Sequence, residues 1–291
     1  MASPEPRYCY RHPDRETGLS CSECGRPICY ECMTPAPVGI RCPEHSGQAH
    51  GIQRVRRTAQ RASYEGSGAV VTKILIGLNT AIYLLELAIG AGISANSGWI
   101  FEHGALIAHS GIFYNGHVIQ GVADGAWWRL ITAAFLHYGP IHLGMNMLAL
   151  WWFGAPLEQY LGRGRYLMLY VVSGLAGSAG ALIVTPNALT VGASGAIFGI
   201  LGAAFVLERQ GSMVFGGQAL AMIVINLVFT FAVGGISIGG HIGGLIGGAL
   251  CMLAMSRFGR GHAVYGKPGL VGIAGVIGVG VLSVVVAYLA V

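Results

Sequence analysis

A serine and a histidine stand inside apolar stretches of this chain, where polar groups are costly. Gly192-Ala193-Ser194-Gly195 opens one such stretch, and His241 lies in the glycine-rich apolar run 239–244. Polar, ionisable groups at membrane depth are functional candidates by default. A serine hydroxyl activated by a histidine base carries out nucleophilic acyl chemistry. Ser194 and His241 therefore suggest a nucleophile and its base working within a bilayer.

The elements that must position this pair are apolar stretches, which dominate the chain from about residue 69. The 291 residues are 54% hydrophobic and only 10% charged, which is typical of a polytopic membrane protein. We expect an all-α membrane protein with seven spans, near residues 70–92, 141–160, 166–185, 192–208, 217–234, 239–256 and 270–290. Ser194 would begin the fourth span and His241 would lie early in the sixth.

The basic residues predict how these spans are oriented. Ten of the 17 Lys and Arg residues fall within residues 1–73. If seven spans alternate, the basic residues that follow spans two, four and six share the side of the N-terminus, and the opposite side carries Arg129 alone. Cytoplasmic loops carry the excess of Lys and Arg. We therefore expect a protein of the cell membrane with a cytoplasmic N-terminus and an extracytoplasmic C-terminus.

Three polar residues on three different spans are expected at a similar depth. Ser194, His241 and Asn146 lie 15, 16 and 17 residues before the arginine that ends each span. At the helical rise these separations are ~22, ~24 and ~25 Å. His142 precedes Asn146 by four residues and so shares its helix face. The unpaired N–H of Ser194, at the start of its helix, and the side chains of Asn146 and His142 would provide donors for an oxyanion.

Glycine repeats favour close packing of the helices that carry Ser194 and His241. Glycines recur every four residues at 239, 243 and 247 and at 240, 244 and 248, and span four has glycines at 195, 199 and 202. Small residues at these spacings let helix backbones approach closely in lipid. No carboxylate matches the depth of His241, since Glu86, Glu158 and Glu208 lie elsewhere in their spans or at span ends. We therefore expect a Ser-His dyad without an orienting acid.

Ahead of the membrane region, cysteine and histidine occur in four pairs that are each separated by two residues. The eight are Cys9, His12, Cys21, Cys24, Cys29, Cys32, Cys42 and His45. A two-residue gap lets both side chains of a pair reach one tetrahedral Zn²⁺, so four pairs suffice for two closed structural sites. A disulfide framework is the alternative, but a reducing cytoplasm and two histidines favour zinc.

The order of these ligands resembles that of a B-box-type zinc finger, over residues 9–45. The resemblance implies a cross-brace, with Cys9, His12, Cys29 and Cys32 on one ion and Cys21, Cys24, Cys42 and His45 on the other; sequential pairing is the alternative. It also implies a protein partner, which the sequence does not name. We expect this zinc-binding domain at residues 1–48 and a basic juxtamembrane linker at residues 49–69.

Four motifs of the membrane region together resemble the rhomboid family of intramembrane serine proteases. They are Trp128-Arg129, His142-x3-Asn146, Gly192-Ala193-Ser194-Gly195 and Gly240-His241-x2-Gly244. The resemblance covers about residues 70–256. It implies Ser194 as nucleophile and His241 as general base, with His142 and Asn146 in the oxyanion hole. It also implies a six-helix core, to which the span at 270–290 adds one C-terminal helix, and a first external loop at 94–140.

Residues 70–291 are thus expected to form a rhomboid-like membrane protease domain. The expected activity is that of an intramembrane serine endopeptidase, which cleaves transmembrane segments near the extracytoplasmic face. Its partners would be transmembrane protein substrates and the lipid bilayer; we expect no nucleic acid and no catalytic cofactor. One alternative is a catalytically inactive rhomboid-like protein that binds membrane proteins. A transporter with broken helices is a third class, which the lack of repeated halves disfavours.

Overall fold

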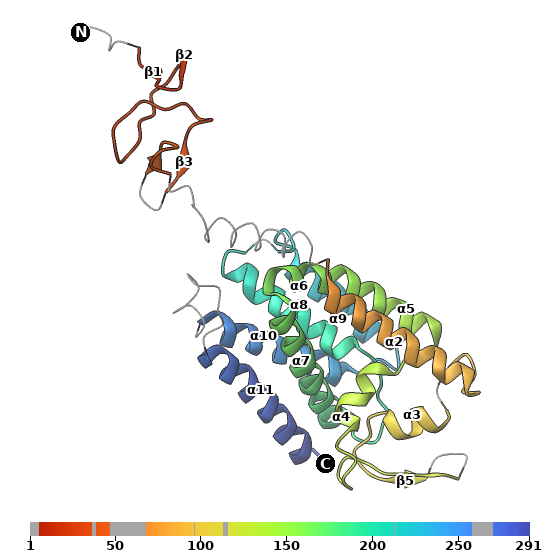
Figure 1. The fold of residues 1–291 in the computed structure, drawn as a ribbon. Coiled ribbons are helices and arrows are strands. Elements are labelled where there is room, and N and C mark those ends of the chain that lie inside the picture. The colour runs from red at the N-terminus through yellow and green to blue at the C-terminus, as the bar shows by residue number, and fades with distance from the viewer. Residues whose placement is uncertain are drawn as a thin grey trace. The chain divides into compact units, whose positions relative to one another are not determined.

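The computed structural model describes residues 6–36, 39–46, 68–95, 97–112, 116–212, 214–257 and 270–291. The chain divides into two compact units, Met1–Ser67 and Gly68–Val291. The first unit contains short strands and loops, and the second is mainly helical (Figure 1). The described residues therefore form a mostly α-helical protein with a small separate N-terminal unit.

Two short hairpins and a cysteine-rich interior make up the first unit. Strand β1 (Tyr8–Cys9) pairs with β2 (His12–Glu16), and β3 (Thr34–Pro35) pairs with β4 (Ile40–Arg41), both antiparallel. Among the described residues of this unit, the buried core consists of five cysteines and one large apolar side chain, Ile28. So small an apolar core does not supply enough folding free energy by itself, and units of this size usually need a metal or disulfides.

The described residues of the second unit form ten α-helices, two irregular helical turns and one hairpin. In chain order these are α2 (Val70–Ala88), α3 (Trp99–Gly104), β5 (Gly111–Ile112), β6 (Val118–Ile119), α4 (Arg129–Thr132), the 3₁₀ turn η1 (Ala133–Phe135), α5 (Gly139–Ala149), the π-helical turn η2 (Leu150–Gly154), α6 (Ala155–Leu161), α7 (Arg163–Val184), α8 (Ser194–Arg209), α9 (Ala219–Ala232), α10 (Ile238–Arg257) and α11 (Leu270–Leu289). Each of the seven stretches expected to span the membrane is helical, and η2 interrupts the second of them.

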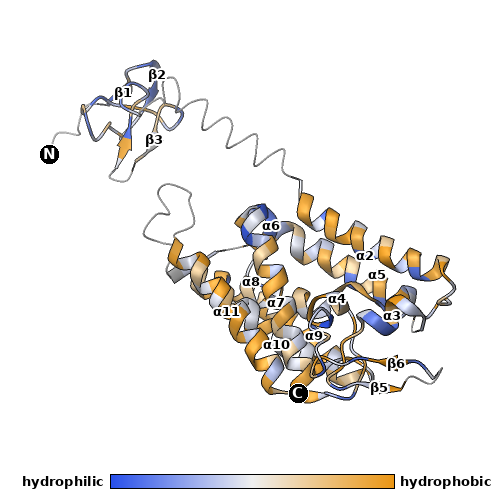
Figure 2. Ribbon diagram, turned by 60° about the horizontal axis from the view of Figure 1, so that its bottom comes forward, coloured by the Kyte–Doolittle hydropathy of each residue, from blue (hydrophilic) through white to orange (hydrophobic). Residues whose placement is uncertain are grey.

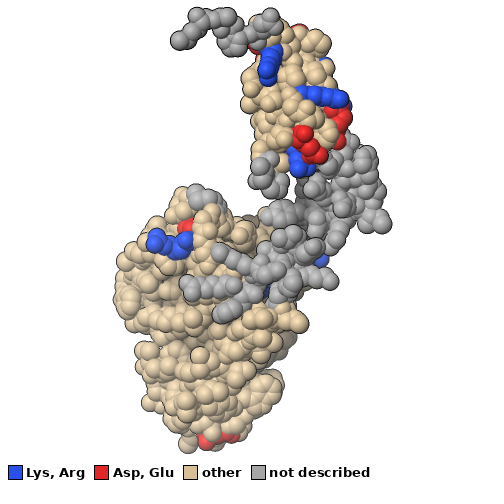
Figure 3. All heavy atoms as spheres, turned by 90° about the vertical axis from the view of Figure 1, so that its left-hand side faces the viewer, with Lys and Arg blue, Asp and Glu red and all other residues tan. Residues whose placement is uncertain are grey.

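Length and composition identify this unit as an integral membrane domain. Among the described residues, four helices are long and apolar enough to cross a bilayer, namely α2, α7, α10 and α11. Helix α9 is apolar but shorter. Hydrophobic residues dominate the helices (Figure 2), and most of one face of the unit carries no acidic or basic side chain (Figure 3). The count of seven crossings, six plus one, stays a prediction.

Glycines allow the helices at the centre of this unit to pack closely. Helix α10 packs against both α7 and α8. A β-carbon at Gly244 would collide with the backbone of Gly195, and one at Gly248 would collide with the backbone of Gly199. These contacts recur every four residues, as the glycine repeats predict. Helices α8 and α10, which carry Ser194 and His241, are therefore held nearly backbone to backbone.

Two glutamates near helix ends cap the first turns of other helices. Glu158, on α6, accepts the N–H of Val71 at 2.9 Å and both the N–H and the hydroxyl of Thr72 at 2.8 Å, at the start of α2. Glu208, on α8, accepts the N–H of Ala219 at 2.9 Å, at the start of α9. A carboxylate at a helix N-terminus satisfies unpaired N–H groups and complements the helix dipole. Both glutamates thus have a structural task.

The Trp128-Arg129 pair fastens the segment between α2 and α5. Arg129 is 1% exposed, and its guanidinium donates hydrogen bonds to the backbone carbonyls of Ala105 and Glu102. The indole N–H of Trp128 donates to the carbonyl of His103 at 2.9 Å. These three carbonyls lie at the C-terminal end of α3, where the helix leaves acceptors unpaired. The motif therefore joins α3 to α4.

Candidate functional site

The structure brings Ser194 and His241 into hydrogen-bond contact. Ser194 is the first residue of α8, and His241 lies in the first turn of α10. The Oγ atom of Ser194 is 2.8 Å from Nε2 of His241. Close approach makes this possible, because a β-carbon at Gly195 would already lie 3.3 Å from the carbonyl oxygen of Gly240. The pair has the separation that proton transfer from a nucleophile to its base requires.

The imidazole ring of His241 has a hydrogen-bond partner at its second nitrogen and an aromatic ring stacked on one face. Its Nδ1 atom is 2.8 Å from Oγ1 of Thr230, which lies on α9 and is 2% exposed. The ring of Phe198 stacks on the imidazole at 4.1 Å between centroids, with 17° between planes. Among the described residues, His241 hydrogen-bonds to two hydroxyl groups and to no carboxylate. Sequence reasoning did not find Thr230, because nothing about a lone threonine in an apolar helix sets it apart.

The imidazole of His142 lies next to the loop that precedes Ser194. The backbone N–H of Tyr138 donates to Nδ1 of His142 at 3.2 Å, so Nε2 carries the proton of the neutral ring. A β-carbon at Gly192 would lie 2.9 Å from that Nε2 and 3.7 Å from Oγ of Ser194. His142 can therefore donate a hydrogen bond into the space beside the serine. The buried ring of His137 lies 5.1 Å from that of His142.

Asn146 lies one helical turn further along α5 and is 5% exposed. Its Nδ2 atom donates to the carbonyl oxygen of His142 at 2.9 Å, within the same helix. The amide has a second N–H, which remains available to another acceptor. Neither catalytic nor oxyanion-binding roles are tested by this geometry, so the assignments of Ser194, His241, His142 and Asn146 stay predictions.

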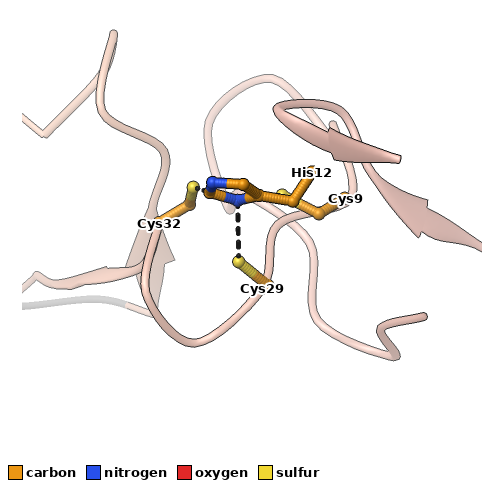
Figure 4. Close-up of side chains that lie close together, drawn as sticks. All are labelled: Cys9, His12, Cys29 and Cys32. Carbon is orange, nitrogen blue, oxygen red and sulfur yellow. Dashed lines mark hydrogen bonds between the residues drawn. The ribbon is translucent and has the colours of Figure 1, made fainter. Parts of the chain in front are cut away.

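In the first unit, one histidine lies among three cysteines. The Nδ1 atom of His12 is 3.8, 3.3 and 3.4 Å from the sulfur atoms of Cys9, Cys29 and Cys32, respectively (Figure 4). Zn–S and Zn–N bonds of ordinary length separate tetrahedral sulfur and nitrogen ligands by about 3.6 Å. The ligand atoms of this cluster all lie within 4.8 Å of one another. Its size and its donor set therefore fit a closed zinc site.

A second cluster contains Cys21, Cys24, Cys42 and His45. The sulfur atoms of Cys24 and Cys42 are 3.8 Å apart, and Cys42 lies 3.1 Å from Nδ1 of His45. Of the four ligand pairs in chain order, the first pair shares a cluster with the third, and the second pair shares a cluster with the fourth. This is the cross-brace that the B-box resemblance implies, and it differs from sequential pairing. Metal binding itself stays a prediction.

Hydrogen bonds around the first cluster favour a thiolate. Burial raises the pKa of the Cys9 thiol, but N–H groups of Cys29, Arg11 and His12 outweigh it, and the pKa falls to about 6. Burial and the neighbouring sulfurs raise the pKa of Cys32 to about 11. Thiolates, rather than thiols, are the ligands of zinc, and a bound cation removes the penalty of placing several of them together.

Comparisons with known proteins identify the membrane unit. The Rhomboid domain family matches residues 124–258. The chain is 36% identical over 207 residues to Rhomboid protease GluP of Bacillus subtilis. The aligned region covers 70% of this chain and 38% of that protein. The chain is 37% identical over 160 residues to Putative rhomboid protease YdcA of the same organism, across 52% of this chain and 79% of that protein. RHOMBOID-like protein 5 of Arabidopsis thaliana is 34% identical over 158 residues, 51% of each chain.

The share of each relative's own length that this chain covers differs among the three. The chain covers little more than a third of GluP and half of the Arabidopsis protein, but about four fifths of YdcA. The family match begins at residue 124, so it does not include the cysteine-rich N-terminal unit. The family match therefore bears on the membrane unit, and the zinc-binding interpretation depends on the cysteine and histidine geometry.

Proposed function

Because this chain belongs to the rhomboid family, we propose that it is an intramembrane serine endopeptidase that cleaves transmembrane segments of other membrane proteins. The observation that carries the proposal is the 2.8 Å hydrogen bond between Ser194 Oγ and His241 Nε2. Two relatives, GluP and YdcA, are named as rhomboid proteases, the second as a putative one. Family membership and the geometry of the pair thus support the same chemistry.

The proposed reaction follows from the positions of these atoms. His241 Nε2 takes the hydroxyl proton while Ser194 Oγ attacks the carbonyl carbon of the scissile peptide. The negative charge that forms on the carbonyl oxygen is stabilised by His142 Nε2–H, the free N–H of the Asn146 amide and N–H groups at the start of α8. The imidazolium then gives its proton to the leaving amine. In the second half of the reaction His241 takes a proton from a water molecule, which attacks the acyl carbon. The bond to Ser194 Oγ then breaks, the imidazolium returns its proton to Oγ, and the second product leaves as a carboxylic acid.

The distribution of basic residues supports a cut near the extracytoplasmic face. Ser194 begins α8, and the same helix ends at Arg209. His241 lies in the first turn of α10, and that helix ends at Arg257. Both arginines lie on the side that the positive-inside rule assigns to the cytoplasm. The dyad is then nearer the opposite face, and the N-terminal unit is cytoplasmic. We place the protein in the cell membrane with its C-terminus outside.

A second proposal concerns the N-terminal unit, which we infer binds two structural zinc ions. The two clusters of four ligand atoms within 4.8 Å support it. With four protein ligands each, neither site has an open position for a substrate or water, so zinc would hold the fold and take no part in proteolysis. We expect the unit, stabilised by zinc, to bind another protein.

The decisive experiment reconstitutes the purified full-length protein in liposomes with a single-span reporter protein. Wild type should cleave the reporter and react with a serine-directed fluorophosphonate probe, and Ser194→Ala should do neither while remaining folded. Cleavage by Ser194→Ala at the wild-type rate would contradict the assignment of the nucleophile. A folded wild type that neither labels nor cleaves would favour the alternative, an inactive rhomboid-like protein that binds membrane proteins.

A further inference from the structure

The hydrogen bonds of Thr230 determine which nitrogen of His241 carries a proton. Oγ1 of Thr230 lies 2.7 Å from the carbonyl oxygen of Asn226 and 2.8 Å from Nδ1 of His241. A hydroxyl group has one proton to donate, and a carbonyl oxygen can only accept. The threonine proton therefore points to Asn226. The remaining contact requires His241 to be the donor, through a protonated Nδ1.

A neutral imidazole with its proton on Nδ1 has an unprotonated Nε2. In this structure Nε2 is the atom that faces Oγ of Ser194, at 2.8 Å. One directed chain of hydrogen bonds therefore joins three helices. Ser194 on α8 donates to His241 on α10, His241 donates to Thr230 on α9, and Thr230 donates to the carbonyl of Asn226 on its own helix.

We propose that Thr230 is a positioning residue for the Ser194–His241 pair, because its hydroxyl selects the tautomer in which Nε2 is the base. The proposal rests on the proposed function, since it assigns Thr230 a role only if His241 is the base. Thr230 contacts His241 and not Ser194, so it acts on the pair through His241. When Nε2 takes the serine proton, Nδ1 keeps its own proton and still donates to Thr230. No proton has to move beyond the ring.

The surroundings of Thr230 make it suited to this task. The residue is 2% exposed, so bulk water does not compete for Nδ1. Its hydroxyl is held by the bond to Asn226 four residues earlier, a common arrangement for threonine in an apolar helix. The imidazole is then fixed at both nitrogen atoms and, through the stacked ring of Phe198, on one face. Thr230 supplies a neutral oxygen where many serine hydrolases use a carboxylate.

A direct test reads the tautomer of the wild-type protein. The full-length chain is labelled with ¹⁵N-histidine and reconstituted in lipid nanodiscs, and the signals of His241 are identified by comparison with His241→Ala. In the neutral ring we expect a protonated Nδ1 and an unprotonated Nε2. A protonated Nε2 would overturn the proposal. This measurement needs no Thr230 variant, so it decides the matter even if such variants fold poorly.

A kinetic test separates positioning from packing. Thr230→Val keeps the size and branching of the side chain but removes the hydroxyl, whereas Thr230→Ser keeps the hydroxyl. Loss of a neutral hydrogen bond should lower kcat about three- to tenfold, with KM unchanged and with a matching fall in the fluorophosphonate labelling rate. Thr230→Ser should stay close to wild type. Thr185→Val is the matched control, because Thr185 makes the same kind of bond, to Ala181 on α7.

The outcomes distinguish the two proposals. Wild-type kcat in a folded Thr230→Val, or a Thr230→Ser as slow as Thr230→Val, would overturn the positioning role and leave the protease assignment standing. If the wild-type protein neither reacted with the probe nor cleaved the reporter, the assignment of Ser194 and His241 as a catalytic dyad would be wrong. The proposed role of Thr230 would then be wrong as well. A loss confined to Thr230→Val, with Thr185→Val unaffected, supports the proposal.

Discussion

Gly192 lies so close to the imidazole of His142 that a β-carbon at Gly192 would be 2.9 Å from both its Cε1 and its Nε2 atoms. The same point is 3.7 Å from Oγ of Ser194, and Gly192 has a φ of +126°. The glycine thus leaves open the space between a hydrogen-bond donor and the proposed nucleophile. That is the space in which the carbonyl oxygen of a bound substrate would have to lie.

Gly192→Ala should therefore abolish most of the activity without unfolding the protein. The added methyl group both meets His142 and requires a backbone conformation that favours glycine. We expect kcat to fall by at least about 10²-fold, as for the loss of one oxyanion donor. Reporter cleavage in liposomes measures the effect. Gly144→Ala, on the same helix as His142 and with no atom within 4 Å of the added carbon, should be near wild type. Equal rates for both variants would refute this account.

Asn146→Ala should be slowed but not silent. Removing one oxyanion donor typically costs ~10²–10³ in kcat, and the residual activity should still require Ser194. Because Nδ2 of Asn146 also bonds the carbonyl of His142, the substitution should also affect His142, and combining it with His142→Ala should cost less than the product of the two single losses. Single-turnover cleavage measures each step. A wild-type rate for Asn146→Ala would show that the residue has no such role.

Arg129→Lys should loosen the segment between α2 and α5. An ammonium cannot reproduce the planar pair of donors that Arg129 directs at the carbonyls of Ala105 and Glu102. One buried carbonyl would lose its partner, which costs roughly 1–3 kcal/mol of stability. Hydrogen exchange of residues 97–112 should increase, and the melting temperature should fall. Trp127→Phe, at a side chain that is 59% exposed, is the control. Unchanged exchange in Arg129→Lys would contradict the role of the motif.

Glu158→Gln should destabilise the membrane unit without altering the site directly. The carboxylate accepts three hydrogen bonds at the start of α2, and bonds to a charged group contribute about 1.5–3 kcal/mol. Glu208→Gln should cost less, because Glu208 is partly exposed whereas Glu158 is 2% exposed. Thermal unfolding in detergent compares the two. A double-mutant cycle with Thr72→Val should show coupling, and strict additivity would mean that Thr72 and Glu158 do not interact.

The zinc-binding N-terminal unit should not be required for proteolysis by the membrane unit. Elemental analysis of the purified chain should find two zinc ions, and Cys29→Ser should break the first site and weaken the second through their shared fold. Deleting residues 1–60 should leave cleavage of a generic reporter intact, because closed sites have no position for a substrate. Complete loss of cleavage, with the membrane unit shown to be folded, would mean that the N-terminal unit supports the protease. A metal-free, folded full-length protein would refute the zinc sites.

Much of the candidate site could be predicted from local pattern. Hydropathy located the seven helical stretches, because a segment in lipid must satisfy its backbone hydrogen bonds internally. Counting residues from the arginines that end the spans predicted that Ser194 and His241 lie at a common depth, and glycine spacing predicted that their helices touch. The structure has that contact at 2.8 Å. These features follow from periodicity and length, both of which a single sequence contains.

The sequence by itself thus determined which residues could meet, and the tertiary structure decided how each one is oriented. Thr230 reaches Nδ1 of His241 because α9 is rotated to present it, and no repeat along α9 encodes that rotation. The backbone N–H of Tyr138 directs His142, and a backbone donor has no signature in residue type. Glu158, a possible orienting acid by charge alone, instead caps α2 from another helix. Hydrogen-bond partners depend on relative helix rotation and translation, which packing across the whole unit sets.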